Sequence, residues 1–591
     1  MRFLAIHSVL ASLVIPPALA VYPVPAPIPT PAAPKAPPAP APNPDVSYPE
    51  KRLAKVTVDI ATGGKVTGRS LLDVESFNGI PYADPPVGPL RLKPPRRLSK
   101  ELGNVDGTGI APACPQMFVS SEAKEGLGKI LGTLLEFPLI KELTGKENCL
   151  TIDVARPAGI KAGDKLPVLF WIYGGGFELG STNTYDATSL LTFAMKNGQP
   201  FVYVAVNYRV GGFGFLPGRE ILHDGSANLG LLDQRMGLEW VADNIDSFGG
   251  DPSRVTLWGV SAGAISVFDQ MLLYGGNATY KGKPLFRGAI MNSGSAVPAD
   301  PVDCPKGQAI YDAVVKEAGC SGARDTLTCL RETPYEKFLH AANSVPSILS
   351  YNSVATSYLP RPDGKVLEDS PDKMGEEGRF HAVPAIIGDQ EDEGTIFAIF
   401  QPNVTTPDAM ADYLSKLFFH NAPRDKLKEF VDLYEPALLQ GSPFRTGVFN
   451  ELYPGFKRIA AILSDITFTV TRRIVLKIAS QVKPDMPTWS YISSYNYGTP
   501  ILGTFHGSDI LQVFYGIWPN NAMRSCRTYY YNFLYNLDPN KGVGGYAKWP
   551  QWKDSQELMW FKSGSRNGII KDDFRSGAAG WLERNRNILH F

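Results

Sequence analysis

The chain has 591 residues and a formal net charge of zero, and 44% of its residues are hydrophobic and 20% charged. This composition is typical of a globular protein and supplies enough apolar side chains for a large core. The balanced charge gives no indication of binding to nucleic acid or to an anionic membrane surface, so neither is expected as a partner.

Residues 1–20 have the three parts of a signal peptide. Arg2 supplies the positive charge, an apolar run follows it, and Ala18-Leu19-Ala20 is a small-x-small cleavage site. A membrane anchor is the alternative, but the apolar run is short and Pro16-Pro17 interrupts it. No other stretch of the sequence has the length and apolarity of a membrane span. The sequence therefore predicts a secreted, extracellular protein with no integral membrane segment.

Residues 21–50 alternate proline with alanine and valine. Such a segment cannot pack a core and favours an extended, polyproline-like conformation. We predict a disordered tail here, with a spacer or a short pro-segment as the functional alternative. The remainder, residues 51–591, has globular composition throughout and is predicted to form one domain.

The globular part is predicted to be an α/β protein. A hairpin is expected first, at residues 56–67 with Gly63-Gly64 in its turn. Buried strands are then predicted from continuous apolar runs at residues 166–172, 201–206, 255–258 and 384–387. Apolar residues recur at helical spacing between residues 228 and 248. Strands that alternate with helices predict a large, mostly parallel central sheet flanked by helices.

The pentapeptide Gly-Val-Ser-Ala-Gly at residues 259–263 stands between a predicted strand and a predicted helix. G-x-S-x-G alone is a weak signal, but in this position it has the form of a nucleophile elbow. Ser261 would then lie at a sharp turn, with its hydroxyl exposed beside a helix N-terminus. The alternative is an ordinary strand-to-helix turn with a capping serine.

A serine hydroxyl becomes a strong nucleophile only when a base takes its proton. Three histidines follow the elbow in the later part of the chain: His420, His506 and His590. His420 stands in a helix-like stretch, and His590 is one residue from the end of the sequence. His506 stands in Gly-Thr-Phe-His-Gly, a glycine-bracketed loop that could direct an imidazole into a cleft, and it is the predicted base.

The base needs a carboxylate that fixes its tautomer and stabilises its charged form. The run from Gly388 to Gly394 follows a predicted strand and offers four candidates, which are Asp389, Glu391, Asp392 and Glu393. At least three of them are expected to belong to a solvated acidic loop that caps the next helix. The order serine, acid, histidine is that of the α/β-hydrolases.

Residues 171–177, Trp-Ile-Tyr-Gly-Gly-Gly-Phe, end a predicted strand in three glycines. Three glycines alone form a flexible turn, but before an elbow they can present free backbone N–H groups to a developing oxyanion. Gly175 and Gly176, together with the N–H of Ala262, are the predicted donors.

Together these motifs resemble the type-B carboxylesterase/lipase family, in particular fungal lipases similar to Candida rugosa lipase, and sterol esterases. Further ordered motifs extend the resemblance from about residue 56 to the end, at residues 77–83, 85–88, 147–150, 233–235, 248–252, 392–395 and 503–506. The resemblance implies an α/β-hydrolase fold, and it selects Glu393 because the family's acid stands just before Gly-Thr. Val260 is a departure, since the family usually has glutamate before the nucleophile.

The resemblance also implies a disulfide between Cys114 and Cys149. A second is implied between Cys320 and Cys329, which leaves Cys304 and Cys526 paired with each other or free. An even number of cysteines fits disulfides in an oxidising compartment. Two sequons, at Asn277 and Asn403, fit N-glycan acceptors.

The segment between Cys114 and Cys149 corresponds to a mobile lid in the resembling lipases. Its apolar residues Leu127, Ile130, Leu131 and Leu134 fall on one helical stripe, and glycines nearby could act as hinges. The sequence therefore predicts an amphipathic lid; a helix packed permanently on the core is the alternative.

The function expected from the residues and the resemblance is a secreted serine hydrolase of long-chain esters that works through an acyl-enzyme. Triacylglycerols are the first substrate class and steryl esters the second, met at a lipid–water interface by a monomer or weak dimer. An esterase for soluble esters is one alternative, and a non-catalytic adhesion or binding module is another, because this fold also serves binding functions. No cofactor is expected, and no metal site either, since no histidine or cysteine cluster has ligand spacing.

Overall fold

The computed structural model describes residues 54–117, 145–517, 519–564 and 566–591. The predicted signal peptide, the predicted proline-rich tail and the predicted lid stripe at residues 127–134 lie outside the described residues.

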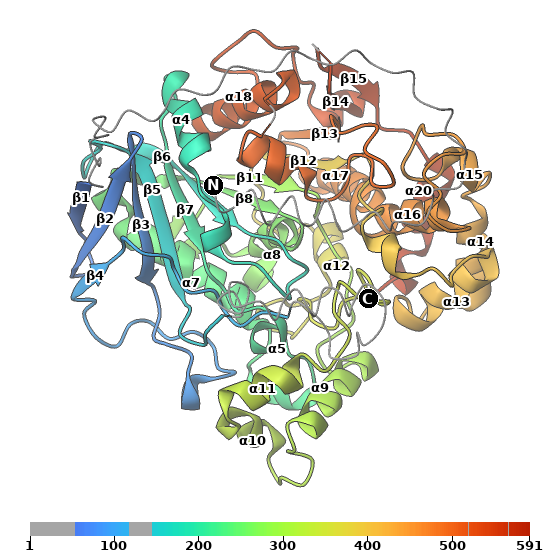
Figure 1. The fold of residues 1–591 in the computed structure, drawn as a ribbon, viewed down its shortest axis with the longest axis horizontal. Helices are drawn as coiled ribbons and strands as arrows, with labels where there is room; N and C mark the ends of the chain where they lie inside the picture. The colour runs from blue at the N-terminus through green and yellow to red at the C-terminus, as the bar shows by residue number, and fades with distance from the viewer. Residues whose placement is uncertain (1–53, 118–144, 518, 565) are drawn as a thin grey trace, which may run out of the picture. The chain divides into compact units, whose positions relative to one another are not determined.

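A single large sheet organises the described part of the chain (Figure 1). Thirteen described strands form it, in the order β1-β2-β3-β5-β7-β6-β8-β11-β12-β13-β14-β15, with β4 paired to β2 off this path. The strand bounds are β1 Ala54–Asp59, β2 Lys65–Leu71, β3 Val74–Pro81, β4 Asn104–Asp106, β5 Thr151–Pro157, β6 Leu166–Ile172, β7 Val202–Val206, β8 Gly250–Val260, β11 Gly288–Asn292, β12 Ala385–Gln390, β13 Thr488–Ser494, β14 Glu557–Lys562 and β15 Gly568–Lys571. A separate small hairpin joins β9 Thr279–Tyr280 to β10 Lys283–Pro284.

The centre of the sheet is parallel and its two ends are antiparallel. Every neighbouring pair from β7 through β6, β8, β11, β12 and β13 to β14 is parallel. The pairs among β1, β2, β3, β5 and β7, and the pair of β14 with β15, are antiparallel. The predicted α/β architecture is confirmed. The predicted hairpin is β1–β2, and the four predicted buried strands are β6, β7, β8 and β12.

Helices and helical turns connect the strands and cover the sheet. The α-helices are α4 Thr188–Lys196, α5 Gly211–Gly214, α6 Arg219–Asp224, α7 Leu229–Asn244, α8 Ala262–Gly276, α9 Pro305–Glu317, α10 Thr326–Glu332, α11 Tyr335–Ala342, α12 Pro371–Glu376, α13 Pro407–Leu417, α14 Arg424–Asp432, α15 Ala437–Gln440, α16 Phe456–Ser464, α17 Val470–Val482, α18 Asn521–Asn536, α19 Trp552–Ser555 and α20 Ser576–Asn585. Two π-helical turns, Asp465–Thr469 and Ile510–Phe514, lie beside the candidate site described below.

Two consecutive residues of β6 show why the central strands are apolar on both faces. The ring of Phe170 lies 3.5 Å from the position that a Cβ on Gly237 of α7 would take. Trp171 contacts Trp258 of β8 at 4.8 Å between ring centroids, and Trp258 in turn contacts Tyr530 of α18 at 5.4 Å. Because successive strand residues point to opposite faces, α7 and α18 cover opposite faces of the sheet.

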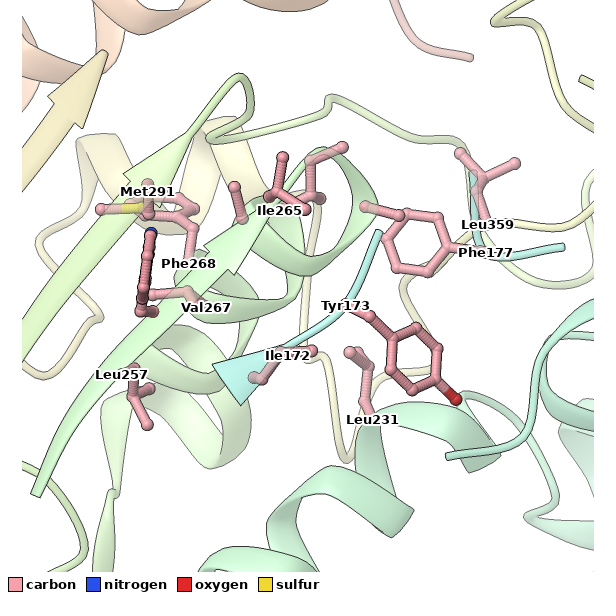
Figure 2. Close-up of a cluster of buried hydrophobic side chains, with 14 of the residues drawn as sticks. Ile172, Tyr173, Phe177, Leu231, Leu257, Ile265, Val267, Phe268, Met291 and Leu359 are labelled. Atoms are coloured by element: carbon pink, nitrogen blue, oxygen red, sulfur yellow. The ribbon is translucent and has the colours of Figure 1, made fainter. Parts of the chain in front are cut away.

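Helix α8 is the element that anchors the core around the elbow. Its residues from Ala262 to Leu273 are all buried. Figure 2 shows Val267 and Phe268 of this helix in one apolar cluster with Leu257 of β8 and Met291 of β11. Burial of such side chains stabilises a fold by roughly 1.5–3 kcal/mol each, so α8 is held firmly against the sheet. The position of Ser261, directly before α8, is fixed with it.

Two disulfides lie within the described residues, Cys114–Cys149 and Cys320–Cys329, as the family resemblance implies. Cys304 and Cys526 are both buried and free, so the second of the two alternatives left open for this pair holds.

Candidate active site

Ser261 lies at a strained turn between β8 and α8. Its backbone has φ of 56° and ψ of −127°, a combination that non-glycine residues rarely adopt. The two flanking glycines make this turn possible. A Cβ on Gly259 would lie 2.2 Å from the carbonyl oxygen of Gly263, and a Cβ on Gly263 would lie 2.0 Å from that of Ile172. The backbone therefore has the geometry of a nucleophile elbow, with Ser261 directly before a helix N-terminus.

The glycine turn that follows β6 lies against this elbow. A Cβ on Gly174 would approach the carbonyl oxygen of Val260 to 2.5 Å and the Cβ of Ser261 to 2.8 Å. Gly175 and Gly176 have φ of 121° and 63°. Among the described residues, the N–H groups of Gly175, Gly176 and Ala262 donate to no backbone or side-chain acceptor. A free N–H group is what the predicted oxyanion role of these three residues requires.

Glu393 and His506 are brought into direct contact. The Nδ1 atom of His506 lies 2.5 Å from Oε2 of Glu393, which is fully buried. The other carboxylate oxygen, Oε1, accepts a hydrogen bond of 2.7 Å from the N–H of Gln390. Glu393 is thus oriented by its own loop, and it in turn orients the imidazole.

Asp392 joins the loop of Glu393 to the loop of His506. Its N–H donates to the carbonyl oxygen of Thr504 at 3.0 Å, and its Oδ2 accepts from the N–H of Thr504 at 2.9 Å. Gly503 has φ of 60°, and a Cβ there would lie 2.1 Å from the same Oδ2. Gly503 is needed for this close approach, which ties the loop of Glu393 to the loop of His506.

The expectation that three of the four acidic candidates are solvated is wrong. Asp389 and Asp392 are fully buried, like Glu393. Asp389 accepts a 2.8 Å hydrogen bond from Arg472, whose guanidinium also binds both oxygens of Asp572 at 2.7 and 2.9 Å. Glu391 pairs with Arg445. Asp389 and Asp392 are buried because Arg472 and the N–H groups of Phe444 and Thr504, all from distant segments, bind them, a long-range arrangement that a local acidic pattern does not reveal.

Ser261 lines an apolar pocket, and two phenylalanines of the same pocket contact His506. Ser261, Gly176 and Ala262 line the pocket, together with apolar side chains that include Phe177, Ile265, Ile348, Val354, Leu359, Phe397, Phe468 and Phe591. The ring of His506 contacts Phe397 at 5.0 Å and Phe468 at 4.7 Å between centroids. Both phenylalanines therefore belong to the pocket wall and to the packing of the imidazole. Phe468 comes from the π-helical turn Asp465–Thr469.

Sequence reasoning missed the residues that fix the glycine turn. Tyr173 and Tyr208 stack at 4.4 Å between centroids, and each hydroxyl donates to the other residue's carbonyl oxygen, at 3.0 and 2.8 Å. Tyr173 and Phe177 lie on the segment that follows β6 (Figure 2). Each tyrosine follows the end of a predicted strand, but the sequence does not show that these two strands, β6 and β7, are neighbours.

Two further buried carboxylates support the site and were also missed. Glu178 accepts a 2.7 Å hydrogen bond from the N–H of Ile348, a pocket residue, and burial raises the pKa of Glu178 to about 8. The second carboxylate, Asp509, acts through Asn292. The backbone carbonyl oxygen of Asn292 accepts a 2.9 Å hydrogen bond from the N–H of Ser261, and its Nδ2 donates to Asp509 at 2.7 Å. Burial raises the pKa of Asp509 to about 6, against the hydrogen bond from Asn292, which lowers it.

The other predicted residues lie away from this centre or have other partners. His420 is exposed just beyond α13 instead of within a helix, and His590 forms ion pairs with Asp300 and Asp372. The sequon residues Asn277 and Asn403 are both exposed. Val260 is buried at the end of β8, where it pairs with Asn292 of β11.

The part of the chain that the structure describes shows neither a metal site nor a membrane-spanning helix. There, no group of three or more histidine, cysteine, aspartate or glutamate side chains is arranged to hold a metal ion. Nor does any described helix combine the length and the apolarity needed to cross a membrane.

The sequence and the fold are similar to those of known esterases and lipases. A secreted triacylglycerol lipase of Gibberella zeae is 63% identical over 541 residues, which cover 91% of this chain and 92% of that one. A secreted lipase of Botryotinia fuckeliana is 57% identical over 540 residues, 91% of this chain and 94% of that one. Lipase 4 of Diutina rugosa is 43% identical over 511 residues, 85% of this chain and 91% of that one.

Among solved structures, EstA of Aspergillus niger superposes with a TM-score of 0.74 at 25% identity, covering 90% of this chain and 99% of that one. The model of the carboxylesterase family matches residues 54–575, which include the elbow, the glycine turn, the acidic run and the histidine loop. The chain belongs to the carboxylesterase family.

Proposed function

We propose that Ser261, His506 and Glu393 are the catalytic triad of a secreted carboxylic ester hydrolase that acts on long-chain esters, triacylglycerols first. The observation that carries this proposal is the 2.5 Å contact between Glu393 and Nδ1 of His506, beside the apolar pocket that Ser261 lines. A carboxylate that holds Nδ1–H leaves Nε2 free to act as the base.

In this mechanism, Nε2 of His506 takes the proton of Ser261 as the serine oxygen attacks the ester carbonyl carbon. The N–H groups of Gly175, Gly176 and Ala262 stabilise the oxyanion, and each such donor contributes roughly 3–4 kcal/mol to transition-state stabilisation. His506 then protonates the leaving alcohol, and an acyl-enzyme forms. A water molecule, activated by the same imidazole, releases the carboxylic acid.

The lining of the pocket at Ser261 supports an apolar acyl group. Its wall is formed mainly by aliphatic side chains and phenylalanines, and burial of a methylene group there contributes about 0.8 kcal/mol. The Gibberella zeae and Botryotinia fuckeliana relatives carry the names triacylglycerol lipase and lipase, and both are named as secreted. Two disulfides and two exposed sequon asparagines also fit an extracellular protein.

Activity of the Ser261→Ala variant tests the catalytic assignment. We expect kcat to fall by at least about 10⁴-fold with an unchanged unfolding midpoint, because the nucleophile is lost and the fold is not. Turnover that persists in this variant would show that Ser261 is not the nucleophile.

Three substrates compared side by side test the substrate class: emulsified triolein, a cholesteryl ester and a short soluble ester. We expect the highest rate on triolein, with a rise in rate once the substrate forms a separate phase. A preference for the cholesteryl ester would assign a sterol esterase instead. A preference for the soluble ester, without any gain above its solubility limit, would contradict a lipase.

A further inference from the structure

A second cavity, of about 540 Å³, lies beside helix α9 and contains no residue of the catalytic proposal. One face of α9 lines it with Lys306, Ala309, Ile310 and Ala313. Its volume falls within the roughly 300–1,000 Å³ that small-molecule sites occupy. We call it the α9 pocket.

The α9 pocket and the pocket at Ser261 share a wall. Val345 and Pro346 line the α9 pocket, whereas Ile348 lines the pocket at Ser261. The same alternation follows in the next segment, where Ala355 faces the α9 pocket and Val354 faces the pocket at Ser261. The lining residues of the two cavities are therefore two positions apart in the first segment and adjacent in the second, so the α9 pocket lies next to the pocket at Ser261.

Three basic side chains line the α9 pocket: Lys306, Lys416 and His420. Burial, and then the charge of Lys306, lower the pKa of His420, so the two lysines are the cationic groups of the pocket. Within the described residues none of the three forms an ion pair, and Lys306 donates only to the carbonyl oxygen of Leu417, at 2.9 Å. The acidic residue at the pocket, Asp300, is already occupied by Asn421 at 3.1 Å and by His590 at 3.6 Å.

The charge of Lys306 is poorly compensated where it lies. Burial, and then the charge of Arg361, lower the pKa of Lys306 to about 7. Lys306 is also the second residue of the 13-residue helix α9, whose N-terminal end carries partial positive charge. An anion held at this point would favour the charged form of the amine and would meet the helix end with the sign that it prefers.

We propose that the α9 pocket binds the anion of a fatty acid, with its carboxylate at Lys306 and its alkyl chain along Ile310, Val345 and Ala355. This inference rests on the proposed function, because the fatty acid is the product that Ser261 releases across the shared wall. Neither half of the pocket alone selects this class: the apolar lining favours any alkyl chain, and the cations favour any anion. A fatty acid carries both.

The test uses the full chain with Ser261 blocked by a long-chain alkyl phosphonate, so that the first pocket is covalently filled. Dodecanoate below its critical micelle concentration is then titrated by calorimetry. We expect one equivalent to bind, and dodecanol, which has the same chain without the charge, to bind at least about 10-fold more weakly. No binding to the blocked protein, or equal binding of the alcohol, would overturn the proposal.

Two variants locate the ligand. Lys306→Gln is expected to weaken dodecanoate binding about 10-fold while leaving dodecanol binding unchanged, since only the charge-assisted bond is lost. Ala313→Trp should abolish binding of both ligands, because the new ring fills the apolar side of the pocket. Lys283→Gln, which removes an exposed lysine on the small β9–β10 hairpin, is the matched control and should bind like the wild type.

Two separate results keep this proposal apart from the catalytic one. Loss of hydrolysis in Ser261→Ala tests the catalytic site alone, and the phosphonate must label Ser261 before any titration begins. Thermal unfolding of each variant then shows whether it is folded. Dodecanoate affinity that is the same in folded Lys306→Gln and in the wild type would show that the fatty-acid site lies elsewhere.

Discussion

The two sides of the candidate site are held in place by different forces. On the nucleophile side, Ser261 and the glycine turn are positioned by close backbone packing around α8, where glycines leave room for neighbouring carbonyl groups. On the acid–base side, Glu393 contacts His506, and the loop of Glu393 is held by buried charges and by hydrogen bonds from distant segments to its neighbours Asp389 and Asp392. Backbone sterics leave a local signature in the sequence, and buried charges satisfied at long range do not.

The largest expected effect lies on the acid–base side, at Glu393→Gln. The amide would keep the shape of the side chain but would present the wrong group to Nδ1 of His506. In serine proteases the corresponding change lowers kcat by about 10⁴-fold, and we expect a loss of this size in hydrolysis of an ester.

Glu391→Gln is the matched control, from the same acidic run. Glu391 pairs with the partly exposed Arg445, not with the histidine, so kcat should change by less than about 5-fold and stability by at most about 1 kcal/mol. Equal losses in the two variants would mean that the whole run, and not Glu393 in particular, supports the base.

The buried guanidinium of Arg472 allows the second test of whether buried charge holds the acid–base side in place. Arg472→Met would leave Asp389 and Asp572 without their common partner in the protein interior. Removing one member of a buried ion pair typically costs about 3–5 kcal/mol, and we expect a loss in that range by urea unfolding.

Arg424→Met is the matched control for a surface arginine. Arg424 binds Asp408 and Asp412, both at 2.8 Å, on exposed helix surface, where such pairs contribute about 0–1 kcal/mol. If both arginine variants lost the same stability, buried charge would not be what holds the acid–base side together.

On the nucleophile side the sharpest test is Gly263→Ala. The added Cβ would lie 2.0 Å from the carbonyl oxygen of Ile172, so either α8 or the end of β6 must move. Overpacking of this kind typically costs about 1–3 kcal/mol. A displacement of about 1 Å at a catalytic group can lower kcat about 10²-fold.

Gly577→Ala in α20 is the control, because a Cβ there would meet no atom within 4 Å. It should leave kcat unchanged, and stability should change by less than about 1 kcal/mol. Full activity in Gly263→Ala would show that the elbow tolerates a shift and that its glycines are not the constraint.

This difference explains how far the sequence alone predicts the site. Ser261, Gly175 and Gly176 stand in motifs whose glycines answer local steric demands, and the parallel strands that carry them are continuous apolar runs. The choice of Glu393 among four neighbouring acids came from the family resemblance, not from local pattern. The partners of the other acids could not be predicted, because Arg472 is 83 residues from Asp389 and 100 from Asp572.

The tyrosine pair behind the glycine turn was missed for the same reason. Tyr173 and Tyr208 are 35 residues apart, and either tyrosine by itself predicts only a buried ring near the end of a strand. Their two reciprocal hydrogen bonds depend on the neighbouring positions of β6 and β7 in the sheet. Residues of this kind become visible only when the strand order is known, whereas a glycine forced into a tight turn is visible in a pentapeptide.

His590 offers a further test of this difference. Its buried charge can be removed by raising the pH, whereas packing around a glycine does not depend on pH. Burial lowers the pKa of His590, but ion pairs with Asp300 and Asp372, at 3.6 and 3.4 Å, outweigh this and raise it to about 9. Since the unfolded histidine titrates near 6.5, folding is stabilised fully below pH 6.5, and this contribution is lost as the pH rises through 9.

We therefore expect His590→Gln to be about 1 kcal/mol less stable than the wild type at pH 6, since solvent screens part of the interaction, and the two proteins to converge above pH 9. His340→Gln, which removes an exposed pair with Glu317, should follow the wild type at every pH. A gap between His590→Gln and the wild type that stays constant from pH 6 to 10 would assign the loss to packing beside Phe591, not to charge. The wall that Phe591 contributes to the pocket at Ser261 would then be held by packing, as the nucleophile side is.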